Sequence, residues 1–246
     1  MPKRKPHKLK TKKSIIKSRG FWLSALAGVV LITLISLGLF LDVFQIKNII
    51  VSGNSNVSAE QITALVNQEM DKNISRSIFA TSASSLTKKI LSEFPKIQTA
   101  VVKKKLFSII TVVLTEREPA LVFGAYYLDA QGIAFEESSG GFPVVRYYGT
   151  QDIQLGHAAI SRELAGYILG IQEVLSLNSI TLSEANISSQ SRLDIQTSEG
   201  WKVYFNLEGE MQGQIKKLAL LLEEGIEDKE SLTYIDLRFK DRAYYK

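Results

Sequence analysis

The sequence predicts a mixed α+β protein in which a single membrane-spanning helix precedes two folded domains. Three observations lead to this prediction: one long uncharged apolar stretch, then a strand-helix-helix-strand-strand order, then a strand-rich remainder that contains two helices. We therefore expect a basic tail over residues 1–20, a membrane helix over 21–41, and two domains over 43–118 and 119–246.

The membrane helix is predicted from Phe21–Leu41, which holds 21 residues without a charge. A helix that crosses a bilayer core needs roughly 20 apolar residues. A buried core helix of this length would normally carry a polar face. A cleaved signal peptide normally has a shorter apolar region, and the segment LFLDVFQI at its end offers no small-x-small cleavage site. An uncleaved anchor is therefore predicted.

The charges on either side of this stretch indicate its orientation. Nine Lys and Arg residues and no Asp or Glu precede it, whereas the remaining 21 Lys and Arg and all 25 Asp and Glu follow it. Because an excess of Lys and Arg stays on the cytoplasmic side, we expect a single-pass type II protein of the cell (inner) membrane. Its N-terminus would be cytoplasmic and its folded part extracytoplasmic.

The basic tail also admits a nucleic-acid interpretation, because clustered cations bind phosphates without sequence preference. The tail contains no aromatic residue that could stack on a base. A topology signal that also touches anionic lipid explains the tail with fewer assumptions. We therefore predict no nucleic-acid partner. Cysteine is absent, so no disulfide framework is expected.

The first extracytoplasmic domain is predicted from periodicity and turn residues. Ser58 is a good helix N-cap, with Gln61 as a capping-box partner and Val57 positioned to staple to Ile62. Pro95 ends the second helix. The expected elements are a strand over 44–52, a helix after Ser58, a helix over 84–93, and strands over 97–104 and 108–117, the last two joined by a turn near Leu106–Phe107.

The second domain reads as a mixed β domain with two helices. Asp129-Ala-Gln-Gly132 predicts a hairpin turn in which the glycine takes a positive φ. The other expected elements are strands over 126–128, 133–135, 142–145, 180–187, 192–197, 201–207 and 232–245, and helices over 161–177 and 211–224.

No reaction centre is predicted. The two histidines, His7 and His157, have no cysteine or second histidine nearby for a metal site, and neither a GxSxG elbow nor a phosphate-binding loop is present. Glu116 and Glu118 flank Arg117 and admit a paired-carboxylate glycosidase as an alternative, but alternating charges at a strand end are usually solvated. We predict no catalytic, metal or cofactor-binding residue and no small-molecule substrate.

The β-α-α-β-β order directly after a membrane anchor resembles the POTRA domain. The following stretch, residues 115–136, resembles the junction in the FtsQ/DivIB family of bacterial cell division proteins. There an acidic-x-x-Pro step leads into a hairpin, and the matching residues are Glu116, Pro119, Ala120, Leu128, Asp129, Gly132 and Phe135. The C-terminal Ile235, Asp236, Arg238 and Phe239 resemble the family's ending, whereas Lys104-Lys105-Leu106 departs from the family's proline-containing turn.

The resemblance implies a non-enzymatic, membrane-anchored scaffold of the divisome at the division septum. Such a scaffold would link division proteins that resemble FtsB and FtsL and help control septal peptidoglycan synthesis. Two alternatives stay open. A POTRA-type chaperone or transport accessory of the cell envelope predicts several POTRA repeats, and an anchored envelope enzyme predicts a catalytic constellation.

The partner-binding residues are expected on the terminal strand, because an edge strand presents unpaired backbone groups to a partner strand. Aromatic and Arg side chains commonly anchor such contacts. From the residues alone, charges that merely keep an edge from aggregating are an equal alternative. The resemblance favours binding, because in this family the terminal strand receives FtsB. The candidate residues are Arg238, Phe239, Lys240, Asp241, Arg242, Ala243, Tyr244 and Tyr245.

Overall fold

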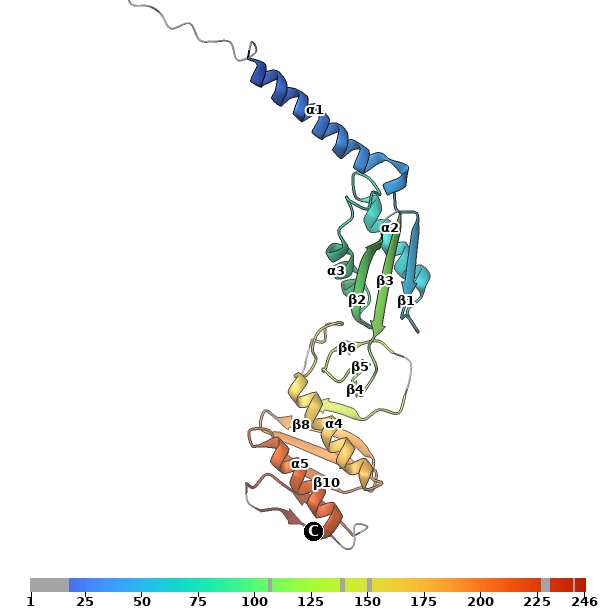
Figure 1. Ribbon diagram of the computed structural model, residues 1–246. Helices are drawn as coiled ribbons and strands as arrows, with labels where there is room; N and C mark the ends of the chain where they lie inside the picture. The colour runs from blue at the N-terminus through green and yellow to red at the C-terminus, as the bar shows by residue number, and fades with distance from the viewer. Residues whose placement is uncertain (1–17, 106–107, 138–139, 150–151, 227–230, 241) are drawn as a thin grey trace, which may run out of the picture. The chain divides into compact units, whose positions relative to one another are not determined.

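The computed structural model of the 246-residue chain describes residues 18–105, 108–137, 140–149, 152–226, 231–240 and 242–246 (Figure 1). Its contacts divide the chain into two compact units. Unit 1 takes in the chain up to Ile50 together with Thr63–Leu86 and Val102–Val112, and unit 2 consists of Val51–Ile62, Thr87–Val101 and Val113–Lys246. The domain limits expected from the sequence, 43–118 and 119–246, stay a prediction.

Helix α1, Arg19–Phe40, is the one helix among the described residues that is long and apolar enough to cross a membrane. Ser18 caps it by accepting a hydrogen bond from the Phe21 backbone N–H at 3.1 Å. None of its residues is buried in the protein, so its apolar surface requires a non-aqueous neighbour. The helix begins two residues before the predicted span. Residues 1–17 of the expected basic tail lie outside the described residues.

A three-stranded sheet with two helices follows α1. The strands are β1 (Asn48–Ser52), β2 (Ile97–Lys105) and β3 (Ile109–Glu116) in the order β1-β3-β2, and the helices are α2 (Ala59–Asp71) and α3 (Ala83–Glu93). The alternation expected in β3 is present, since Ile110, Val112 and Leu114 are buried. The Ser58 hydroxyl accepts from the backbone N–H groups of Glu60 and Gln61, at 3.1 and 3.4 Å, which confirms the N-cap.

The strand expected over residues 44–52 is shorter than predicted. Asp42–Phe44 forms a short 3-10 helix, and Gln45 makes only a single β-bridge, to Ser77. The β-branched composition that predicted the strand is concentrated in its second half, where β1 forms. The predicted turn at Leu106–Phe107 lies outside the described residues.

Within the described part of unit 2, a nine-stranded mixed sheet runs in the order β12-β11-β10-β9-β8-β7-β4-β5-β6. Its strands are β4 (Leu121–Phe123), β5 (Tyr126–Leu128), β6 (Ala134–Phe135), β7 (Val144–Tyr147), β8 (Leu182–Ser189), β9 (Arg192–Thr197), β10 (Lys202–Asn206), β11 (Tyr234–Asp236) and β12 (Tyr244–Tyr245). The pairs β4–β7, β7–β8 and β10–β11 are parallel. The fold class expected from the sequence, α+β with an apolar N-terminal helix, is confirmed.

Helices α4 (Arg162–Leu177) and α5 (Met211–Leu220) cover one face of this sheet, in front of β8 and β10 in Figure 1. Alternate sheet residues point into the core beneath them, among them Leu193, Ile195, Val203 and Phe205. Helix α4 confirms the helix expected over 161–177, and the Ser161 hydroxyl caps it by accepting from the Leu164 backbone N–H at 3.2 Å. The helix expected over 211–224 consists of α5 and a π-helical turn that follows it, Leu221–Gly225.

Candidate partner-binding site

The C-terminal residues form the outer edge of the nine-stranded sheet. Strand β11 lies parallel to β10, and β12 returns antiparallel to β11 with Ile235 opposite Tyr245 and Asp236 opposite Tyr244. A single continuous strand over 232–245, as expected from the sequence, is therefore wrong. The chain leaves the sheet after β11 and re-enters it as β12, which becomes the outermost strand.

The turn out of β11 is stabilised by Asp236 and Arg238. The Asp236 carboxylate accepts from the Arg238 backbone N–H at 3.1 Å and from the guanidinium Nε and Nη2 at 2.9 and 2.5 Å. Burial alone would raise the pKa of the Asp236 carboxyl, but the hydrogen bonds from Arg238 and the charges of Arg238 and Arg192 lower that pKa below its ordinary value. Asp236 and Arg238 thus stabilise the turn by which the chain leaves β11.

The Arg238 side chain lies on the sheet face that α4 and α5 leave uncovered. Its guanidinium carbon is 5.5 Å from the centre of the Tyr204 ring, and that of Arg192 is 4.9 Å from the same ring. Cations over an aromatic face at this distance are attracted to it. Tyr234 extends the cluster, with its ring centre 6.0 Å from that of Tyr204. Arg238 is therefore positioned by its own sheet.

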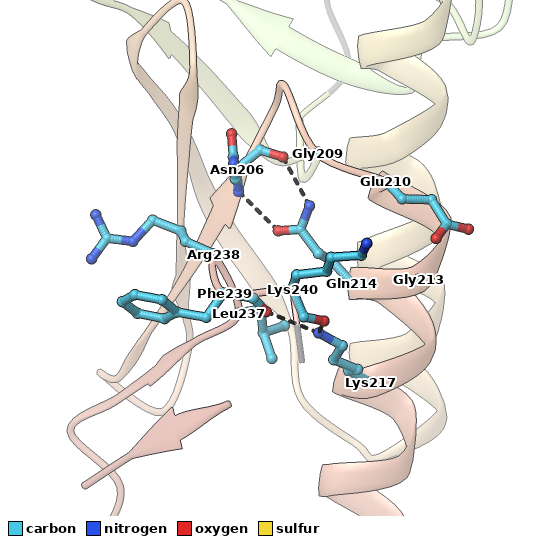
Figure 2. Close-up of a pocket in the computed structure, with 10 residues that line it drawn as sticks. All are labelled: Asn206, Gly209, Glu210, Gly213, Gln214, Lys217, Leu237, Arg238, Phe239 and Lys240. Carbon is cyan, nitrogen blue, oxygen red and sulfur yellow. Dashed lines mark hydrogen bonds between the residues drawn. The ribbon is translucent and has the colours of Figure 1, made fainter. Parts of the chain in front are cut away.

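A cavity of about 230 Å³ separates the loop after β11 from α5 (Figure 2). The Gln214 amide closes one side by bonding the backbone N–H and C=O of Asn206, both at 2.8 Å. Lys217 reaches across from α5 and donates to the Phe239 carbonyl at 3.0 Å and to the Lys240 carbonyl. Figure 2 shows Arg238 and the Phe239 ring on the side of the loop away from α5. Lys217 thus fixes the loop that carries them.

Three exposed aromatic side chains lie at this edge. The Phe239 and Tyr244 rings meet edge to face, with centres 5.1 Å apart. Phe239, Tyr244 and Tyr245 are 49%, 46% and 51% exposed. Exposed aromatic side chains in a group are typical of protein contact surfaces. Ala243 beside them is half-buried against the core.

The backbone of β12 presents unpaired groups at the same place. The Lys246 N–H donates to the Tyr234 carbonyl at 3.2 Å, and the Tyr234 N–H donates to the Lys246 carbonyl at 3.3 Å. These two residues form a hydrogen-bonded pair, so the next pair, Ile235 and Tyr245, is of the non-hydrogen-bonded kind. The N–H and C=O of Tyr245 therefore point away from β11, toward the open edge.

The predicted site residues are thus divided among different environments. Phe239, Tyr244 and Tyr245 form the exposed aromatic group, Arg238 binds Asp236, and the Lys240 carbonyl accepts from Lys217. Arg242 is exposed. Asp241 lies outside the described residues. Sequence reasoning missed Tyr204, Gln214 and Lys217, because only the tertiary fold brings β10 and α5 to this loop.

The carboxylates that the sequence offered as a catalytic pair have a structural position. One Glu116 oxygen accepts from the backbone N–H groups of Ser55, Asn56 and Val57 at 2.6 to 2.9 Å. Burial raises the pKa of the Glu116 carboxyl, but these hydrogen bonds outweigh it and lower the pKa below its ordinary value. Glu118 is exposed. The described residues contain no group of three or more His, Cys, Asp or Glu side chains that could hold a metal ion.

Replacing Glu116→Gln is expected to lower the free energy of unfolding by about 1–2 kcal/mol at pH 7, because charge-assisted hydrogen bonds to three backbone donors are weakened. A carboxyl whose pKa is depressed in the folded state stabilises the protein above its unfolded pKa of about 4.3 and loses that contribution as pH falls through the folded value. Denaturant titrations should show the difference from the wild type shrinking below about pH 4. Glu118→Gln is the control and should change little.

Next to Glu116, the Arg117 side chain also joins segments that are separated in the sequence. Arg117 donates through Nε to the Pro95 carbonyl at 3.0 Å and through Nη1 to the Asp129 carboxylate. The other Asp129 oxygen accepts from the backbone N–H groups of Gln131 and Ile133, both at 2.9 Å. Gly132 in this turn has a φ of +78°, which confirms the predicted glycine turn.

Two protein-family models match the chain on either side of this junction. Residues 44–117 match the FtsQ-type POTRA domain, and residues 120–238 match the C-terminal domain of the cell division protein FtsQ/DivIB. The chain belongs to the FtsQ/DivIB family. The three-stranded sheet with α2 and α3 is accordingly the POTRA domain of this family.

Curated relatives agree with the family models. The chain is 28% identical over 155 residues to the cell division protein FtsQ of Neisseria gonorrhoeae and to that of Neisseria meningitidis. Each match covers 60% of this chain and 59% or 60% of the relative, so it spans about three fifths of each relative's length. Together with α1, family membership indicates a membrane-anchored protein of a cell division family.

Proposed function

We propose that this chain is a non-enzymatic scaffold of the bacterial divisome, anchored in the cell membrane by α1. It binds other division proteins through the sheet edge at β12. The observation that carries this proposal is the Tyr245 backbone, whose N–H and C=O point to the open edge beside the exposed rings of Phe239 and Tyr244. An edge of this kind accepts a partner strand through main-chain hydrogen bonds, and its side chains select the partner.

The partners are other anchored division proteins, which resemble FtsB and FtsL. The Lys and Arg bias before α1 supports a cytoplasmic N-terminus and extracytoplasmic folded units. Partners anchored in the same membrane would then present their extracytoplasmic segments to this edge at the division septum. By holding them together the scaffold would help control septal peptidoglycan synthesis, a role that requires binding surfaces and no reaction centre.

Replacing Tyr245→Pro tests strand addition directly. Proline removes the outward N–H of residue 245, whereas Lys246 and Tyr234 keep their inward hydrogen bonds. The protein should fold normally, and we expect co-purification of coexpressed FtsB-like and FtsL-like proteins to fall at least about tenfold, as the loss of one buried hydrogen bond with an unpaired partner group predicts.

A further variant separates the contribution of the Tyr245 backbone from that of its side chain. Tyr245→Ala keeps the N–H and loses the ring, and should weaken binding through lost aromatic contact alone. Deletion of residues 232–246 is a poor test, because it removes Ile235 and Leu237, which are fully buried. Wild-type binding by both Tyr245→Pro and Tyr245→Ala would contradict strand addition at this edge.

A further inference from the structure

The loop between α2 and α3, residues 72–82, contacts the C-terminal end of the membrane helix within unit 1. The Ser77 hydroxyl is fully buried and donates to the Gly38 carbonyl at 2.7 Å. The Phe79 ring lies 3.7 Å from the position that a Cβ on Gly38 would occupy. A hydrogen bond and a ring contact thus join this loop to the last turn of α1.

The segment that follows α1 is bonded to the same loop. The Ile46 N–H donates to the Arg76 carbonyl at 3.0 Å, and the Ile78 N–H donates to the Phe44 carbonyl at 2.9 Å. The Phe44 and Phe79 rings meet edge to face, with centres 5.2 Å apart. The connection from α1 to the rest of unit 1 is therefore fixed by hydrogen bonds and a ring contact and is not a free tether.

The position of Gly38 in the apolar run determines the depth of this loop. Gly38 precedes Leu41, the last residue of the run, by three residues, which is about 4.5 Å along a helix. When α1 crosses the bilayer, Gly38 lies near the outer limit of the hydrocarbon core. A helix end at this depth needs partners for its last carbonyls. The Ser77 hydroxyl donates to the Gly38 carbonyl, and the Gln45 side-chain amide donates to the Leu39 carbonyl at 2.7 Å.

The exposed side chains around this corner have the chemistry of a membrane surface. Ile74 is 87% exposed, Phe79 59% and Val43 54%, so three apolar side chains lack cover from the protein. Lys104 donates to the Ile78 and Thr81 carbonyls at 2.8 and 2.9 Å, which places the end of β2 beside the loop. Exposed cations of this region include Lys47, Lys103 and Lys105, whereas the loop's own Lys72 and Arg76 are paired with Glu69 and Asp71. Apolar side chains bordered by cations are typical of segments that lie in the lipid headgroup region.

We propose that the 72–82 loop of unit 1 lies in the outer headgroup region of the membrane that α1 crosses, with Ile74 and Phe79 in contact with lipid. Lys47, Lys103 and Lys105 face the headgroup phosphates. The inference rests on the proposed membrane anchor and adds a second attachment to it. The POTRA domain would thereby be held against the bilayer, so that α1 and the loop together set its orientation.

The absence of cysteine makes a site-specific test simple. Ile74→Cys and Phe79→Cys in the full chain would each be labelled with an environment-sensitive fluorophore and reconstituted in vesicles of phosphatidylcholine and phosphatidylglycerol. Quenching by nitroxide-bearing lipids measures contact with the bilayer. Leu31→Cys, in the middle of α1, reports whether the anchor is inserted. Ala64→Cys is the matched aqueous control, since it is exposed on α2 about 10 Å before that helix ends.

We expect the labels at positions 74 and 79 to lose most of their fluorescence to the lipid quencher, with emission shifted to the blue, while the label at 64 does not change. If the label at 31 is quenched but those at 74 and 79 match the label at 64, the inference is wrong and the anchor stands. If the label at 31 is not quenched, the anchor and the inference both fail. Ile74 is the most exposed large apolar residue in the part of the chain that the structure describes, so its label distinguishes these outcomes without disturbing packing.

Discussion

Replacing Asp129→Ala should lower the free energy of unfolding of unit 2 by about 3–5 kcal/mol, because it leaves the partly buried Arg117 guanidinium without its carboxylate. The two side chains are 3% and 13% exposed. The change also removes the acceptor for the Gln131 and Ile133 backbone N–H groups. Both losses lower the free energy of unfolding, because each leaves hydrogen-bond donors without an acceptor.

Trp201 offers a clean measurement of this loss. It is one of two tryptophans and is 1% exposed in unit 2, so a Trp22→Phe background makes its fluorescence report unit 2 alone. Urea titration in detergent then compares Asp129→Ala with Arg146→Ala, which breaks the exposed Arg146–Glu184 pair, 65% and 31% exposed. The surface variant should cost about 1 kcal/mol or less.

A double variant separates charge burial from packing. Arg117→Met combined with Asp129→Leu removes both charges and should recover part of the stability that Asp129→Ala loses, because the uncompensated buried cation is gone. If Asp129→Ala destabilised unit 2 no more than Arg146→Ala, the buried pair would have no structural importance.

Replacing Gly132→Ala should cost more than about 3 kcal/mol, because strain and collision add at this position. Its φ of +78° is disfavoured for residues with a Cβ. The Cβ would also lie 2.4 Å from the Ile160 carbonyl oxygen, a backbone atom that cannot rotate away. The Gly132 carbonyl also accepts from the Ala159 N–H at 2.9 Å, so the turn at Gly132 is fixed against the segment that contains Ala159 and Ile160.

Gly124 provides the matched control for this prediction. It also has a positive φ, +61°, but among the described residues no atom lies within 4 Å of its would-be Cβ. Gly124→Ala should therefore cost only about 1–2 kcal/mol of φ strain. Asparagine, which tolerates positive φ, should rescue position 124 and fail to rescue position 132. Urea unfolding monitored by Trp201 fluorescence measures the free energy of unfolding of each variant. Equal decreases for Gly132→Ala and Gly124→Ala would show that the Ile160 contact has no influence.

Much of the fold was predictable because its signals are local. The uncharged run predicted α1, and alternation predicted β3 and β10 to within one residue at each end. Ser58 predicted a helix start, because an N-cap acts on backbone groups only two or three residues away. These features need no knowledge of the rest of the molecule.

The candidate site was predictable in location but not in geometry. Its aromatic and basic residues were read from the sequence, yet they were placed on one long strand. The fold-back depends on β10, which pairs with β11 through residues about thirty positions earlier, and on Lys217, which holds the loop from α5. Strand pairing and side-chain reach between distant segments leave no periodic trace in the sequence.

The sequence by itself thus determined the anchor, the order of the elements and the glycine turn at Gly132, because each rests on hydrophobic run length, periodicity or local backbone preference. Only the tertiary structure decided that the Ile160 carbonyl lies where a Cβ at position 132 would be. It also decided that Ser77 donates to the last turn of α1 and that the Tyr245 backbone faces an open edge. The physical reason is the same in all three cases. Contacts between segments far apart in the chain are chosen by the packing of the whole core, which no local pattern encodes.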